Sequence, residues 1–132
     1  MRPPGWESLL AAHLAAARTR PFAWGEHDCV LWSAEWVRQI TGTGPAAEWR
    51  GAYATAEEAA SVLAAMGFTS WADLADPHLP AIPVTCARRG DIMAHPVNGG
   101  LGICDGAHAY FVTERGLTRV EYTKCPRAWA VG

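Results

Sequence analysis

The sequence lacks an apolar run long enough to cross a membrane, and the segment from Met1 to Trp6 lacks the apolar core of a signal peptide. It also lacks clusters of lysine and arginine, and its formal net charge is −2. Surfaces that bind nucleic acid or anionic lipid need such clusters. We therefore expect synthesis in the cytoplasm, no nucleic-acid partner and no insertion into a membrane.

Close pairs of cysteines are absent as well. The four cysteines, Cys29, Cys86, Cys104 and Cys125, stand far apart in the chain. Zinc sites and iron–sulfur clusters normally include at least one short spacing such as Cys-x-x-Cys. Disulfides are not expected in a chain without an export signal. The spacing thus predicts no metal site and no cofactor.

The chain is long enough and apolar enough to form one hydrophobic core, since it has 132 residues and half of them are hydrophobic. We expect a single domain over residues 1–132. Its first part reads as helices. Apolar residues at helical spacing predict helices from Trp6 to Ala17, from Asp28 to Ile40 and from Ala59 to Met66, the last opened by a Thr55–Glu58 capping box, with a short helical turn after Ser70.

The second part of the sequence has the pattern of strands and turns instead of helices. An extended connector with prolines at positions 77, 80 and 83 precedes a run of short strands and turns. The predicted strands cover residues 91–95, 101–104, 109–113 and 117–122, and the segment 125–129 packs a final strand or turn against the sheet. Helices followed by an antiparallel meander predict an α+β fold, with helices packed on a C-terminal sheet.

The stretch from Trp24 to Cys29 is the candidate functional segment. Gly25 permits a sharp turn, and Asp28 can cap the helix that begins at Cys29. A thiol in the first turn of a helix is favoured as the thiolate by the helix dipole, although burial among tryptophans opposes this effect. Cys29 is therefore the candidate nucleophile. The alternative is a small buried residue at a helix start.

Four short motifs occur in this order: Trp24-Gly25, Asp28-Cys29, Gly90-Asp91-Ile92 and Leu101-Gly102-Ile103. Together they resemble motifs of the NlpC-type papain-like cysteine peptidases of bacterial cell walls. The similarity covers about Phe22 to Trp129 and is greatest to a short, uncharacterised branch found in bacteriophage tail gene clusters. The resemblance implies a minimal papain-like fold. It also implies other tail subunits as partners, and a final location in the virion tail after synthesis in the bacterial host cytoplasm.

Thiol hydrolysis also needs an imidazole that moves the proton and a polar group that orients it. In the family that the chain resembles, this histidine begins the strand that here starts with Leu101, which places Gly100 at its position. The orienting residue falls near Val112, so both expected partners are missing.

Another histidine could substitute for the missing base. His95 ends one strand and His108 starts another, so either becomes a candidate catalytic partner of Cys29 after a modest register change. His27 could bond the thiol locally. Each also has a plain explanation as a solvated polar residue beside a turn. His78, among the prolines, is a weaker catalytic candidate still, and His13, on the apolar face of the first helix, is expected to be a structural or partly exposed residue and not a ligand.

Two main hypotheses follow. In the first, the chain is a bacteriophage tail or tail-tip assembly protein whose papain-like active site is degenerate. Its seven tryptophans, some of them expected to be partly exposed, supply binding surface. In the second, it is a thiol-dependent cell-wall peptidase that cuts peptidoglycan with Cys29 and His108 or His95. A cysteine–histidine metal module ranks below both.

Overall fold

Capping side chains mark where two of the four α-helices, α2 and α4, begin in the computed structural model, which describes residues 1–132. The Asp28 carboxylate accepts a hydrogen bond from the Leu31 N–H at 2.9 Å, and the Thr55 hydroxyl accepts one from the Glu58 N–H at 3.1 Å. The helices are α1 (Trp6–Thr19), α2 (Cys29–Thr41), α3 (Ala46–Trp49) and α4 (Ala56–Ala65). The three predicted helices are thus confirmed, and the short helix α3 was not predicted.

The capping box of α4 differs in one detail from the prediction. The Glu58 carboxylate accepts from the N–H of Ala54 at 3.3 Å, one residue before the expected Thr55. A complete capping box forms instead at Ser70 and Asp73, where it opens a 3₁₀ helix over Trp71–Ala75. Further 3₁₀ turns cover Val84–Cys86 and Tyr122–Lys124.

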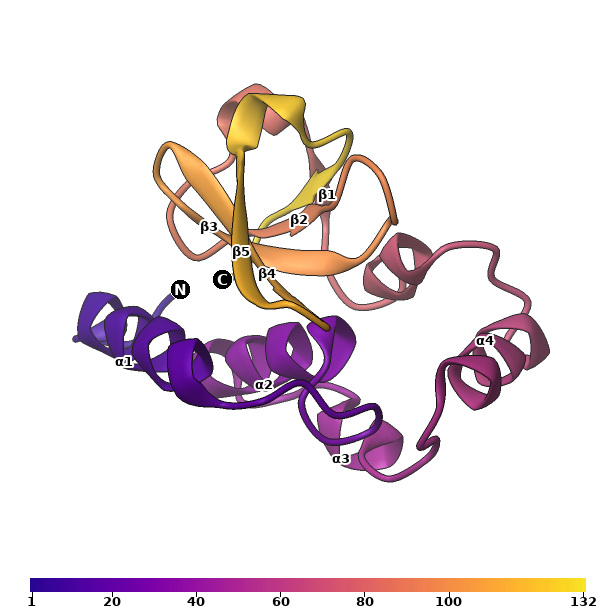
Figure 1. Cartoon of the computed structure of the whole chain (residues 1–132). Helices are drawn as coiled ribbons and strands as arrows, with labels where there is room; N and C mark the ends of the chain where they lie inside the picture. Colours follow the sequence, from indigo (N-terminus) through magenta and orange to yellow (C-terminus); the bar gives the residue numbers. More distant parts are fainter.

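The sheet has six antiparallel strands in the order β1-β6-β2-β3-β4-β5. They are β1 (Ala81–Ile82), β2 (Ile92–Ala94), β3 (Leu101–Asp105), β4 (His108–Thr113), β5 (Gly116–Glu121) and β6 (Ala128–Trp129). The predicted meander from β2 to β5 and the return of the last segment to the sheet are confirmed. The short strand β1 was not predicted. Helices on one side of an antiparallel sheet define an α+β fold (Figure 1).

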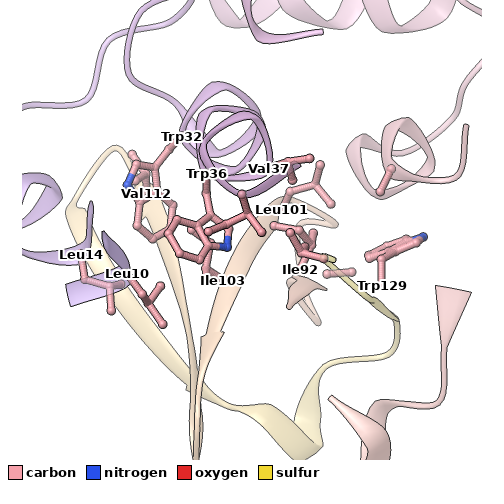
Figure 2. Packing of buried hydrophobic residues seen from close by; sticks show 14 of the residues in the cluster. Leu10, Leu14, Trp32, Trp36, Val37, Ile92, Leu101, Ile103, Val112 and Trp129 are labelled. Carbon is pink, nitrogen blue, oxygen red and sulfur yellow. The ribbon is translucent and has the colours of Figure 1, made fainter. Parts of the chain in front are cut away.

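The main core lies between α1, α2 and one face of the sheet. Trp36 of α2 is fully buried, and its indole N–H donates to the Gly90 carbonyl at 2.8 Å. Figure 2 shows Trp36 above Ile103, with Leu10 and Leu14 of α1 beside them. The predicted packing of α2 on the sheet is therefore confirmed, and this packing fixes where the first residue of α2 sits relative to β3.

The two ends of the chain meet between the helices and the sheet (Figure 1). The Arg2 guanidinium donates to the Val131 carbonyl at 2.9 Å and forms an ion pair with Asp91 at 2.8 Å. Asp91 is only 1% exposed, and its carboxylate also accepts from the N–H groups of Arg88 and Val131. Both carboxylate oxygens of Asp91 accept hydrogen bonds, and Arg2 supplies the opposite charge. The buried charge of Asp91 is therefore compensated where the two ends of the chain meet.

His13 has the structural role that was expected of it. Its ring stacks on Trp32 with centroids 5.1 Å apart, and its Nε2–H donates to the Trp32 carbonyl at 2.9 Å. The amide of Gln39 lies 3.3 Å from its Nδ1. Burial lowers the pKa of His13. The ring thus joins α1 to α2 as a neutral group.

Candidate functional site

A tight turn brings the chain to the start of α2. Gly25 has φ = +78°, and a Cβ atom at this position would lie 1.9 Å from the Tyr53 carbonyl oxygen. Only glycine fits such a backbone conformation with such a close neighbour. The Gly25 N–H donates to Asp28 at 3.0 Å, and Ala23 and His27 form an isolated bridge that closes the turn.

Asp28 organises this turn from within the protein. It is 1% exposed, caps α2, and accepts a hydrogen bond from the Tyr53 hydroxyl at 2.8 Å. Burial first, and then the charge of Asp28, raise the pKa of Tyr53, which therefore stays a hydrogen-bond donor. Tyr53 was missed by sequence reasoning because it is a lone aromatic residue in a loop, where no periodic pattern marks a buried partner.

Cys29 is the first residue of α2, as expected, but its thiol is not activated. Burial raises the pKa of Cys29 to about 12. Backbone N–H groups of Leu101 and Val30 act in the opposite direction and are outweighed. Asp28, next in the chain, raises the pKa further. The thiol is therefore protonated at neutral pH, and burial has prevailed over the helix-terminus effect.

Gly100 occupies the space where a base would be needed. A Cβ atom built on Gly100 lies 3.2 Å from the Cys29 sulfur and 2.9 Å from the Asn98 side-chain oxygen. A side chain at this position would therefore point directly at the thiol, and the chain has none there. Val112 is buried in the main core and offers no polar atom. Neither position supplies an imidazole or a group to orient one.

His95 is the best-placed substitute for the missing base, because it lines the same cleft as Cys29. Its Nδ1 atom faces two backbone donors, the N–H groups of Val97 at 3.1 Å and Asn98 at 3.3 Å. These donors assign the lone pair to Nδ1 and the proton to Nε2. Since Nδ1 is occupied, Nε2 is the nitrogen left to act as a general base, but Nε2 carries the proton. His95 is therefore held in the tautomer that donates a hydrogen bond. Burial also lowers the pKa of His95, and its ring packs edge-on against Phe111.

His108 is not brought to Cys29. It pairs with Asp105 at the far end of β3, whereas Gly100 and Leu101 lie at the near end. At about 3.3 Å per residue, five residues separate the two ends of this hairpin by roughly 16 Å. The register change that would close this distance is excluded by the turn between β3 and β4.

The two other histidines, His27 and His78, do not supply a base to the thiol by hydrogen bonding. His27 is 3% exposed, and its Nε2 atom has no hydrogen-bond partner. Burial first, and the charge of Arg20 second, lower the pKa of His27, so it remains neutral. His78 is exposed and packs edge-on against Trp49. Neither forms a hydrogen bond with Cys29.

An open cleft of about 640 Å³ lies over Cys29. One side is aromatic: Trp24 packs against Phe22 and Trp71, with ring centroids 4.9 and 6.4 Å apart. His95, Val97 and Asn98 and the polar turn between β4 and β5 also line the cleft. The arrangement can bind a ligand, but nothing beside the sulfur can accept its proton.

The four cysteines are free, and no group of three or more His, Cys, Asp or Glu side chains gathers where it could hold a metal ion. None of the helices combines the length and the apolar character that a membrane crossing requires.

The fold and this site together describe an α+β domain with a half-buried thiol that lines an aromatic cleft. Residues 1–131 match the family described as a domain of unknown function, DUF6950, and the chain belongs to this family. No curated protein and no solved structure matches the chain.

Proposed function

We propose that this chain is a non-hydrolytic papain-like domain of the NlpC type that acts as an assembly or accessory protein in a bacteriophage tail, at or near its tip. The proposal rests on the sulfur of Cys29, which faces the bare backbone of Gly100 at the position where the resembling peptidases carry their histidine. A domain that keeps the helix and the thiol but not the base can retain the fold while losing the reaction.

The chemistry explains why the loss is decisive. A general base at a positioned site contributes about a hundredfold or more to the rate, and a protonated thiol is a poor nucleophile. Burial raises the pKa of Cys29 to about 12, so the thiolate is scarce at neutral pH. The only imidazole on the cleft, that of His95, is held by the N–H groups of Val97 and Asn98 in the donating tautomer.

The assembly role draws on the resemblance and on the surface. Trp6, Trp24, Trp49 and Trp71 are half-buried, which leaves part of each ring free to contact another protein. Tryptophan is enriched at such interfaces because it buries a large area at low entropic cost. The connector from Pro77 to Pro83 is also largely exposed. Partners would be neighbouring tail subunits in the virion, after synthesis in the bacterial host cytoplasm.

The second candidate is a cell-wall peptidase that uses Cys29 and His95. The observation that favours it is the presence of both side chains on one cleft. For this activity, the turn after His95 would have to release Nδ1, so that the ring could present a lone pair to the thiol. Peptidoglycan would then be its substrate.

The two functions separate in a phage that carries this gene. Cys29→Ala and Cys29→Ser variants should give normal numbers of tails and normal infection under the assembly proposal. Intact tails that adsorb but no longer penetrate the cell wall would instead show an active enzyme. Cys86→Ser, at an exposed cysteine outside the cleft, is the matched control for loss of a thiol.

A further inference from the structure

The free polar atoms of the cleft over Cys29 are mainly hydrogen-bond donors. His95 presents Nε2–H, because its Nδ1 accepts from the backbone. The side-chain oxygen of Asn98 is bonded to the Gly100 N–H at 2.8 Å, which leaves the two N–H groups of the amide. The Thr113 hydroxyl is already bonded to the Gly116 carbonyl at 2.9 Å. A ligand that fits these atoms must be rich in acceptors.

Positive charge continues from this cleft along β5. Arg115 lines the cleft, and Thr118 is shared with an adjoining hollow of about 430 Å³ that Arg18 and Arg119 also line. The ion pairs of the chain involve other arginines, namely Arg2, Arg38, Arg89 and Arg127. Against these three free guanidinium groups the cleft offers one carboxylate, Glu114. The strip is therefore locally cationic in a chain with a net charge of −2.

Of these arginines, Arg119 lies on β5, Arg115 lies in the turn before β5, and Arg18 lies on α1; β5 itself is at the edge of the sheet. β5 pairs only with β4, so its outer backbone groups have no strand partner. An edge strand of this kind can pair with an added peptide strand, whose alternate side chains then reach neighbouring pockets. A nucleic acid or a small anion could use the arginines but not this backbone edge. The geometry thus favours a polypeptide.

We propose that the cleft over Cys29 and the Arg18–Arg115–Arg119 strip form a docking site for an extended acidic peptide segment of a neighbouring protein. In this arrangement an apolar side chain of the peptide packs on Trp24 and Trp71. Its carboxylates pair with the arginines and with the donors of His95 and Asn98. The inference rests on the proposed assembly function, for which it supplies the partner chemistry and the surface.

Fluorescence anisotropy with a short labelled peptide tests this. The peptide alternates leucine with glutamate and carries blocked ends, so that only side chains are charged; the matched peptide has glutamine for glutamate. We expect the glutamate peptide to bind and to weaken at high ionic strength, because exposed charge pairs are screened by salt. The glutamine peptide should bind much more weakly. Each of Arg115→Ser and Arg119→Ser should reduce affinity by about two- to fivefold, the range for an exposed ion pair.

Arg88→Ser is the matched control, since Arg88 is exposed but lies outside the strip. Its affinity should equal that of the wild type. Equal binding of the two peptides, or an Arg88→Ser loss as large as that of Arg119→Ser, would overturn the proposal. Tighter binding of a labelled oligothymidylate, competing with the peptide, would also overturn it in favour of nucleic acid.

Mass spectrometry of the peptide after incubation separates this inference from the function on which it rests. An intact peptide that binds supports both. Cleavage that disappears in Cys29→Ala, together with Arg119-dependent binding, would refute the non-hydrolytic function and leave the docking site standing. No binding, with no cleavage, would refute the docking site alone.

Discussion

Replacing Asp28 by alanine should destabilise the protein far more than the loss of an ordinary helix cap. The Asp28 carboxylate accepts from the N–H groups of Leu31 and Gly25 and from the Tyr53 hydroxyl, all buried and between 2.8 and 3.0 Å. A lost cap costs about 1 kcal/mol. Each further buried donor left without a partner costs about 1–3 kcal/mol. We expect Asp28→Ala to lower the free energy of unfolding by about 3–7 kcal/mol, measured by urea denaturation.

Two variants make this prediction specific. Thr55→Ala removes a cap of the same kind at the exposed start of α4 and should cost only about 1 kcal/mol. Adding Tyr53→Phe to Asp28→Ala removes one orphaned donor, so the double variant should lose about 1 kcal/mol less than the sum of the single variants. If Asp28→Ala costs no more than Thr55→Ala, the buried network does not hold the turn and the reasoning is refuted.

Two further predictions concern charge. Gly100→His places an imidazole against Cys29 and should lower the pKa of the thiol; alkylation of Cys29 by iodoacetamide at neutral pH should then accelerate about tenfold or more, whereas Gly100→Ala should not accelerate it. An unchanged rate in Gly100→His would show that the position does not face the sulfur. The second prediction concerns pH: burial holds the pKa values of His13 and His27 below the ordinary 6.5, so the unfolded chain binds more protons just below that pH. Stability should be complete above pH 6.5 and fall as the pH drops through the folded-state pKa values; urea midpoints in His27→Gln should fall less steeply, and an equal slope would contradict the assignment.

Local signals predicted the helices and the meander well. The Asp28 cap and the helical spacing after it located α2, and the turn signals between strands located β2 to β5. In contrast, β1 consists of two residues in a proline-rich connector, and it exists only because β6 returns to pair with it. Such a strand depends on a partner nearly fifty residues away, which local patterns do not encode.

The candidate site was likewise predictable only where local sequence or the resemblance carried the information. Gly100 beside Cys29 followed from the resemblance, and the structure places its backbone against the sulfur. His108 is a poorer candidate than its position next to a strand end suggests. The Asp105–His108 pairing puts it at the opposite end of the hairpin, a consequence that the turn at Gly106 already implies. The tautomer of His95 depends on two backbone N–H groups in a folded turn, which no sequence pattern reveals.

The pH dependence of Cys29 alkylation in the wild-type protein tests the central claim most directly. The rate of carboxamidomethylation at Cys29, followed by peptide mass spectrometry, reports the thiolate fraction at each pH. A thiol without a base and with a pKa of about 12 should show a rate that still rises about tenfold per pH unit at the alkaline end of the stable range, and exposed Cys86 should react first at neutral pH. A rate at Cys29 that is already high and flat between mildly acidic and neutral pH would reveal a thiolate–imidazolium pair, and would contradict the account.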